Sequence, residues 1–190
     1  MTALETTYLA TDDPLMQSGY SGGRERWIVE RSPLAEAIDR SGDFLDVGCA
    51  NGVLLEDVVR WAAAHGHAIV PFGIDLGPGL IDLARRRHPG HSTNFVVANA
   101  WEWAPDRGWD YVFALVDLAP VHLVEHWVRR LLSWVSIPGR LIIGSYGSRS
   151  RSIDPVDVST LLFRIGLRVS GQSSAPGAEP ITRFAWVDVV

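Results

Sequence analysis

The sequence of 190 residues predicts an α/β fold, in which a doubly wound, seven-stranded and mostly parallel sheet ends in an antiparallel strand. Three observations lead to this prediction. From Phe44 onward, short apolar segments alternate with segments whose apolar residues recur at helical spacing. Residues 111–116 (YVFALV) are apolar without a break, which is typical of a strand buried on both faces. The last two apolar segments are joined by a loop alone, so we expect them to pair antiparallel.

The first half of the chain supplies three of these strands. After the first strand, an apolar stripe predicts a helix that ends near Gly66, and residues 80–87 (LIDLARRR) predict the next helix. We expect the second strand to start after Pro71, because proline cannot donate to a strand ladder. The expected strands are residues 44–47, 72–75, 94–98, 111–116, 140–146, 167–170 and 181–190.

The second half supplies two further helices. Pro120 is expected to open a helix, since proline is favoured at the first helical position. Asp154 and Pro155 are expected to cap another helix, which stops at Gly166. Residues 171–180 (GQSSAPGAEP) have a low-complexity composition and predict a loop between the last two strands.

Residues 1–43 precede the first expected strand and predict a helical N-terminal lid segment, separate from a sheet domain of residues 44–190. Ser32 and Pro33 are expected to start a helix that Gly42 ends.

The composition is that of a folded protein with an intracellular character. Hydrophobic residues make up 47% and charged residues 21%, and no apolar run approaches the ~20 residues that span a bilayer. The first residues are acidic, without the basic and apolar regions of a secretory signal. Cys49 is the only cysteine, which fits a reducing compartment, so we expect a cytoplasmic protein that has no membrane partner.

Charge and residue usage exclude several kinds of site. The net charge of −5 gives no general attraction to nucleic acid. All 17 basic residues are arginine, which excludes a lysine Schiff base and a lysine-bearing phosphate loop. Four of the six histidines lie near turns without a matching group of cysteines or carboxylates, so no metal site is expected.

Residues 46–52 (DVGCANG) join the first strand to the first helix of the sheet. Gly48 allows a sharp turn, and Ala50 and Gly52 let a ligand approach the backbone at the helix start. Asp75 ends the second strand, where an acidic side chain can accept both hydroxyls of a ribose. Up to this point, a nicotinamide cofactor fits equally well.

The spacing of the small residues disfavours the nicotinamide alternative. A dinucleotide fingerprint has small residues at the first, third and sixth places, which here are Gly48, Ala50 and Val53. Asp46 is not part of that fingerprint either. The stretch LDVGCANG instead resembles the acidic-x-G-x-G-x-G motif of the class I S-adenosylmethionine (SAM)-dependent methyltransferases, with alanine in place of the middle glycine.

The resemblance extends over residues 44–190 and implies contacts with the rest of SAM and of its product, S-adenosylhomocysteine. Asp75 matches the ribose-binding acid of the family, with Leu76 beside the adenine, and Asn99 stands where the family more often has aspartate. Either Trp101 or Trp103 is a candidate for stacking on the adenine. Cys49 is expected to be an inert small residue of the turn. The expected cofactor-binding residues are Tyr20, Asp46, Gly48, Cys49, Ala50, Gly52, Asp75, Leu76, Asn99, Ala100 and Trp101.

Two residues after the fourth strand are candidates for catalysis. Asp117 and His122 follow that strand at the mouth of the sheet, where the resemblance places the methyl acceptor. His122 is expected in a first helical turn, where the helix dipole favours a neutral imidazole that can accept a proton. The alternative is an exposed histidine at a helix start, in which case Asp117 is the next candidate base.

The sequence therefore predicts a SAM-dependent methyltransferase that acts on an O or N atom of a small molecule. We expect no nucleic-acid partner, and a homodimer is compatible with the sequence. Residues 16–27 carry Tyr20 and Trp27 in a glycine- and serine-rich stretch and predict a lid over SAM; the alternative is a disordered leader. Two other functions stay open, a nicotinamide-dependent oxidoreductase and a catalytically silent SAM-binding protein.

Overall fold

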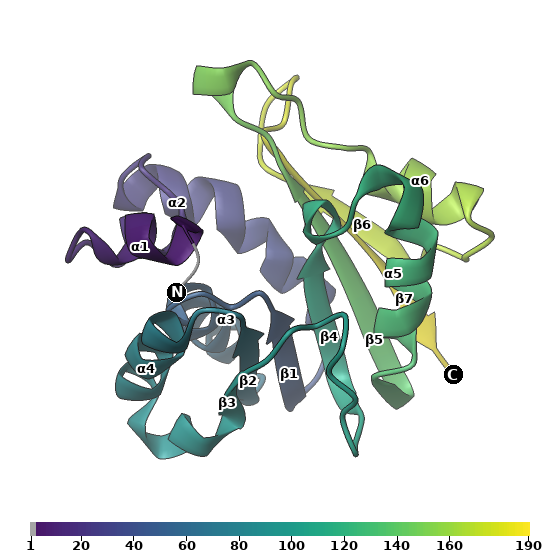
Figure 1. Cartoon of the computed structure of the whole chain (residues 1–190). Coiled ribbons are helices and arrows are strands. Elements are labelled where there is room, and N and C mark those ends of the chain that lie inside the picture. Colours follow the sequence, from purple (N-terminus) through teal and green to yellow (C-terminus); the bar gives the residue numbers. More distant parts are fainter. Residues whose placement is uncertain (1–2) are drawn as a thin grey trace.

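The computed structural model describes residues 3–190, and the side chains from Glu5 onward; the first two residues of the predicted 1–43 segment lie outside this range. Seven strands form one sheet in the order β3-β2-β1-β4-β5-β7-β6 (Figure 1). The strands are β1 (Gly42–Val47), β2 (Ile69–Asp75), β3 (Phe95–Val97), β4 (Trp109–Leu115), β5 (Val135–Tyr146), β6 (Gly171–Ser174) and β7 (Thr182–Val189).

The strand directions confirm the predicted fold class. The pairs β1–β2, β1–β4, β2–β3 and β4–β5 are parallel, whereas β7 runs antiparallel to both β5 and β6. The strand order reverses beside β1, because the chain moves to β2 on one side and to β4 on the other. Ligands of such sheets bind at the carboxyl ends of the strands next to this reversal.

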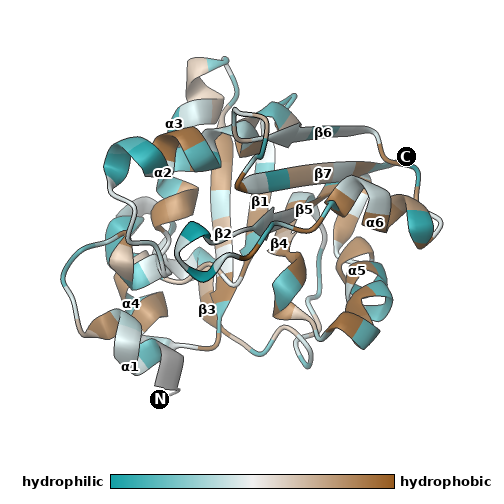
Figure 2. Ribbon diagram, turned by 90° about the horizontal axis from the view of Figure 1, so that it is seen from above, coloured by the Kyte–Doolittle hydropathy of each residue, from teal (hydrophilic) through white to brown (hydrophobic). Residues whose placement is uncertain are grey.

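Helices cover both faces of the sheet. The face with α3 (Val53–Ala64) and α4 (Pro78–Arg87) lies opposite the face with α5 (Val124–Leu132) and α6 (Val158–Arg164) (Figure 2). Alternate residues of each strand supply the two cores, since successive side chains of a strand point to opposite faces. Phe44 and Phe113 pack beneath α3, while Leu45 and Val112 pack in the core that includes α5 and α6.

The N-terminal segment packs against the α3 face. It contains α1 (Ala3–Leu9), α2 (Arg24–Arg31) and the short 3-10 helices Met16–Ser18 and Ser32–Ala37. Trp27 is 3% exposed and belongs to the same core cluster as α3. The predicted helix from Ser32 to Gly42 is wrong in extent, because the 3-10 helix ends at Ala37 and Gly42 already pairs with Ile69 as part of β1.

Pro71 does not precede β2 but lies inside it, opposite Phe44 of β1. The carbonyl of Pro71 accepts a hydrogen bond from Asn94, and β3 pairs with β2 only from Gly73 onward. The nitrogen of Pro71 faces the same side of β2 as its carbonyl, the side of β3. At this position β3 has not yet begun, so no backbone hydrogen bond is lost and the proline is tolerated.

The sixth strand also differs from its prediction, because it is Gly171–Ser174 and not residues 167–170. Gly171 lies flat against Trp186 of β7, where a Cβ atom would come within 2.3 Å of the indole ring. This edge strand is polar and half exposed, so its sequence has the composition of a loop.

Two helix starts differ as well. Asp157 caps α6 by accepting a hydrogen bond from the amide of Thr160 at 3.0 Å, so this helix begins at Val158 and not after Asp154 and Pro155. Pro120 leads into the 3-10 helix Val121–Leu123, and α5 begins only at Val124.

Candidate functional site

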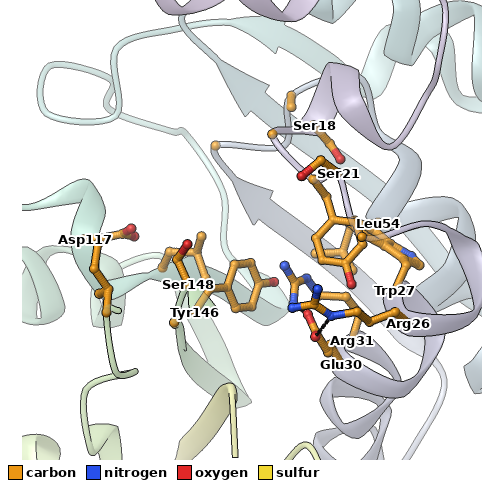
Figure 3. Close-up of a pocket in the computed structure, with 18 of the residues that line it drawn as sticks. Ser18, Ser21, Arg26, Trp27, Glu30, Arg31, Leu54, Asp117, Tyr146 and Ser148 are labelled. Atoms are coloured by element: carbon orange, nitrogen blue, oxygen red, sulfur yellow. Dashed lines mark hydrogen bonds and ion pairs between the residues drawn. The ribbon is translucent and has the colours of Figure 1, made fainter. Parts of the chain in front are cut away.

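A cavity of about 630 Å³ opens at the carboxyl ends of β1, β4 and β5. The N-terminal segment forms one wall, and the loop after β5 forms another. In Figure 3, Trp27 and Ser21 lie on one side of the cavity, and Asp117 and Ser148 lie on the other. Cavities of this size hold cofactors and drug-sized molecules. The strand ends supply Asp46, Val47, Gly48, Phe113, Leu115 and Tyr146.

The glycine turn between β1 and α3 forms the floor of the cavity, and Gly48, Cys49 and Ala50 line it. The amides of Gly48 and Cys49 donate to the carbonyl of Ile74, which fixes the turn against β2. Gly48 has φ 88°, and a Cβ atom there would come within 3.0 Å of Leu118. Ala50 has φ 47°, a left-handed conformation that is costly for a residue with a Cβ atom.

Asp75 lies beside this turn and holds it from the second strand. Its carboxylate accepts one hydrogen bond from the amide of Ala50 at 2.9 Å and one from the amide of Gly77 at 2.8 Å. Burial raises the pKa of Asp75, while the two amide hydrogen bonds lower it. A carboxylate offers about four acceptor positions, so acceptor capacity remains for a ligand hydroxyl.

Asp46 is a buried acid at the end of β1 that lines the cavity. Burial, and then the nearby Asp75 carboxylate, raise the pKa of Asp46 to about 8. A cationic group bound in the cavity would lower this pKa again, since it favours the charged carboxylate.

Arg31, at the end of α2, lies inside a group of aromatic side chains. Its guanidinium carbon is 3.6 Å from the ring centroid of Tyr146, 5.0 Å from that of Tyr20 and 5.2 Å from that of Trp27. Tyr20 and Trp27 pack edge to face at 5.2 Å. Burial and the neighbouring Glu30 carboxylate raise the pKa of Tyr20 to about 12, so its phenol stays protonated.

The guanidinium of Arg31 is buried without sufficient hydrogen-bond partners. Arg31 is 6% exposed, and its Nε and Nη1 atoms have no hydrogen-bond acceptor. The nearest carboxylate oxygen, of Glu30, is 3.6 Å from Nη1, which is too far for a hydrogen bond. The hydroxyl of Tyr146 is also buried without a partner. Unsatisfied buried donors are rare in folded proteins, so a ligand acceptor is expected beside them.

Asn51 connects the glycine turn to the N-terminal segment. Its Nδ2 atom donates to the carbonyl of Pro14 at 2.9 Å and to the side chain of Gln17 at 3.2 Å, and its Oδ1 atom accepts from the amide of Val53. The floor and one wall of the cavity are therefore hydrogen-bonded to each other.

The surroundings of Gly52 and Cys49 indicate a packing role in the turn. Gly52 does not line the cavity, and a Cβ atom there would come within 3.1 Å of both Ala84 and His88. Burial raises the pKa of the Cys49 thiol well above its usual value, which keeps it protonated and a poor nucleophile.

The residues predicted to contact an adenine lie beyond Asp75, outside the walls of this cavity. Leu76 is exposed, and Asn99 accepts a hydrogen bond from the amide of Trp101 at 3.1 Å. The carbonyl of Ala100 accepts from Arg130 of α5. The ring of Trp101 packs on Trp127, at 4.9 Å, and on His126, and Trp103 packs on Trp109 and Trp134.

The two candidate catalytic residues are not brought together. Asp117 lines the cavity, whereas His122 is exposed in the 3-10 helix Val121–Leu123 and does not line it. Of the other predicted site residues, Gly52 and Asp75 do not line this cavity, and those that do are Tyr20, Asp46, Gly48, Cys49 and Ala50.

Sequence reasoning did not find Arg31 and Asn51. The only signal for Arg31 is an arginine one helical turn after Trp27, a spacing that many helices share.

In the described part of the chain, no three histidine, cysteine or carboxylate side chains are placed to hold a metal ion. Across residues 3–190, no helix has the length and apolarity needed to cross a membrane.

Comparisons with known proteins give one related sequence and many similar folds. No family model matches the chain. Over 103 residues, the chain is 40% identical to a trans-aconitate 2-methyltransferase of Rhodopseudomonas palustris (strain BisB18). This match covers 52% of the chain and 38% of the relative, so the chain spans well under two thirds of that protein's length.

Two solved structures match nearly the whole fold. The N-methyltransferase NodS from Bradyrhizobium japonicum WM9, in complex with S-adenosylhomocysteine, has a TM-score of 0.70 and 18% identity, and the match covers 98% of the chain and 96% of NodS. A SAM-dependent methyltransferase from Aquifex aeolicus has a TM-score of 0.66 and 16% identity, and both chains are fully covered.

Proposed function

We propose that this chain, which has the fold of the class I SAM-dependent methyltransferases, transfers a methyl group from SAM to a small-molecule acceptor. One observation carries the proposal. The cavity at the glycine turn is lined by an unsatisfied buried cation, Arg31, and a buried acid, Asp46. This pair suits a zwitterion, and SAM ends in an amino acid group that carries both charges.

The residues present suit the amino acid group and the ribose of SAM. Arg31 would bind the α-carboxylate, because a guanidinium pairs with a carboxylate through two hydrogen bonds. Asp46 would accept from the α-ammonium, since a neighbouring cation restores its charged form. The remaining acceptor capacity of Asp75 would serve the ribose hydroxyls. We propose that the adenine lies beyond Asp75, near Leu76 and Asn99.

Bound SAM supplies a methyl group on a positively charged sulfur, so the protein needs no covalent intermediate. The chain has to orient the acceptor and exclude water from the cavity. Tyr20 and Trp27 support this role, because both are buried in the N-terminal segment beside the cavity. We propose that this segment acts as a lid, and that Asp117 lies on the acceptor side.

The size of the cavity favours a small-molecule acceptor. At about 630 Å³ it has the size of pockets that hold drug-sized molecules, and the chain as a whole is acidic, which disfavours nucleic acid. The related sequence is named for transfer to trans-aconitate, a small acid, which supports the same class of acceptor. We place the activity in the cytoplasm, because the single cysteine suits a reducing compartment.

Titration calorimetry with SAM, S-adenosylhomocysteine and NAD⁺ tests the proposal. We expect both sulfur compounds to bind and NAD⁺ not to bind. Arg31→Gln should weaken binding about 10- to 100-fold, which corresponds to the roughly 1.5–3 kcal/mol of a hydrogen bond to a charged group. Arg86→Gln removes an exposed arginine of α4 and serves as the matched control.

The outcomes separate the alternatives. Binding of NAD⁺ in preference to SAM would favour a nicotinamide-dependent oxidoreductase. Tight binding of S-adenosylhomocysteine without transfer of labelled methyl to any acceptor would favour a catalytically silent SAM-binding protein. Equal losses in the Arg31 and Arg86 variants would remove Arg31 from the site.

A further inference from the structure

The loop after β5 brings two arginines to the cavity at the side opposite the N-terminal segment. Arg149 and Arg151 belong to the 3-10 helix Arg149–Arg151, and both line the cavity together with Ser148 and Ser150. Among the residues that the structure describes, no carboxylate forms an ion pair with either arginine. Within the described part of the chain, the side chain of Arg151 donates a hydrogen bond to the hydroxyl of Ser148 at 3.3 Å.

The charge of the cavity is therefore opposite to that of the chain. The chain has a net charge of −5, whereas four arginines line the cavity against Glu30, Asp46 and Asp117. Glu30 is occupied, because it forms ion pairs with Arg26 at 2.6 Å and with Arg31 at 3.6 Å. A surplus of guanidinium groups in a concave site raises the local concentration of anions and favours carboxylate ligands.

The cavity offers little to deprotonate an acceptor. No histidine belongs to its described lining, and the only thiol, of Cys49, is held protonated by burial. Burial also raises the pKa of Tyr20 and Tyr146, so these phenols act as hydrogen-bond donors and not as bases. Asp117 is the one acid of the lining that is neither buried nor paired with an arginine.

From these observations we infer that the methyl acceptor is a small di- or polycarboxylic acid, which is methylated on a carboxylate oxygen. This inference rests on the proposed methyltransferase function. Arg149 and Arg151 hold one carboxylate at the mouth of the cavity, and the hydroxyl of Tyr146 donates to the carboxylate that reacts. A carboxylate acceptor explains both the positive charge of Arg149 and Arg151 and the lack of a histidine in the described lining of the cavity.

The reaction balances without a base. A carboxylate oxygen forms a bond to the methyl carbon, the carbon–sulfur bond breaks, and its electron pair remains on sulfur. The products are a methyl ester and S-adenosylhomocysteine, and no proton is transferred. An alcohol or an ammonium group would instead have to lose a proton to a group of the cavity.

Two measurements test the inference. The first is calorimetry of succinate, fumarate and citrate with the protein saturated by S-adenosylhomocysteine, beside the neutral amides of the same acids. We expect at least one acid to bind and its amide not to bind. The variant Arg149→Gln/Arg151→Gln should weaken this binding at least tenfold, whereas Arg86→Gln/Arg164→Gln removes two exposed arginines elsewhere and should leave it unchanged.

The second measurement identifies the product. Methyl groups from labelled SAM are traced after treatment with alkali, which releases methanol from methyl esters but not from ethers or methylamines. Release of labelled methanol supports the inference. An alkali-stable product, or equal binding of acids and amides, overturns the inference. Either result is compatible with the proposed function, because the protein would still transfer methyl groups or bind S-adenosylhomocysteine. Failure to bind SAM or S-adenosylhomocysteine overturns the proposed function itself.

Discussion

The indole Nε1 of Trp27 donates a 2.7 Å hydrogen bond to Oδ2 of Asp57, and this contact joins the N-terminal segment to α3, the helix that follows β1. Asp57 is 1% exposed and also accepts two hydrogen bonds from Arg24, at 2.5 and 2.6 Å, and one from Arg60. The segment that lines one wall of the cavity is thus tied to α3 through a buried carboxylate. Deletion of residues 1–27 would remove Trp27 from the core, so substitutions test the segment more cleanly.

Asp57→Ala should strongly destabilise the protein. The substitution leaves the Trp27 N–H group buried without an acceptor and separates Arg24 from its partner. Leaving a buried donor without its acceptor costs about 1–3 kcal/mol, and the loss of the charge-assisted hydrogen bonds from Arg24 adds to this. Asp82→Ala is the control, because its ion pair with Arg85 is exposed and contributes about 1 kcal/mol or less. Urea unfolding followed by circular dichroism measures both, and equal losses would contradict the structural role of Asp57.

Asp75→Asn should weaken binding of SAM by about 1.5–3 kcal/mol, since a ribose hydroxyl loses a charged acceptor. The amide group of asparagine also places a donor toward the backbone amide of Ala50 or of Gly77, which disturbs the turn. Calorimetry gives the affinity, and Asp82→Asn on α4 is the matched exposed control. An unchanged affinity in Asp75→Asn would separate the residue from the ribose.

The contribution of Asp46 to the free energy of unfolding of the ligand-free protein should fall as the pH rises from about 4 to about 8. The pKa of Asp46 is about 8 in the folded protein, whereas an unfolded aspartate titrates near about 3.9. Between these values the folded state holds a proton that the unfolded state lacks, so raising the pH favours unfolding. Below about pH 4 and above about pH 8, Asp46 does not contribute to the pH dependence of the free energy of unfolding.

Asp46→Asn isolates this contribution, because asparagine has a similar size and no charge. Urea unfolding at pH 5 and at pH 8 should show a smaller loss of stability in the variant than in the parent. Titrating groups that are remote from Asp46 contribute equally to both proteins. If both lose the same stability over this interval, Asp46 is charged throughout and the pKa assignment is wrong.

The lid hypothesis predicts slower amide exchange in residues 16–27 when S-adenosylhomocysteine binds. Tyr20 and Trp27 surround Arg31, and a carboxylate bound to Arg31 would hold these three side chains together. Hydrogen exchange with mass spectrometry gives the comparison, and β4, in the middle of the sheet, is the internal reference. Unchanged exchange in residues 16–27 would leave the segment with a packing role alone.

His122→Ala should keep the rate and the pH profile of the parent enzyme. The histidine is exposed and lies outside the cavity lining, and the inferred carboxylate acceptor needs no base. The hypothesis that His122 is the general base predicts the opposite result, a kcat lowered by about 10²–10⁴ and the loss of the acidic limb. Steady-state kinetics between pH 5 and pH 9 decide between the two.

The sheet could be predicted because each interior strand is a short apolar run of its own, as in residues 111–116. The edge strand Gly171–Ser174 was missed, because one of its sides faces no partner and polar residues suffice there. The glycine turn and Asp75 carried a local pattern. Arg31 carried none, since its role depends on Tyr146, which is 115 positions away in the chain but stacks on its guanidinium.

The hydrogen bonds from Asn51 to Pro14 and Gln17 have a practical consequence for handling the protein. They attach the start of the chain to the turn that would receive the cofactor, so a fusion partner that displaces the N-terminal segment should distort that turn and weaken ligand binding. Val190, at the other end of the chain, is 97% exposed and lies outside both cores. Affinity tags for purification and immobilisation therefore belong at the C-terminus.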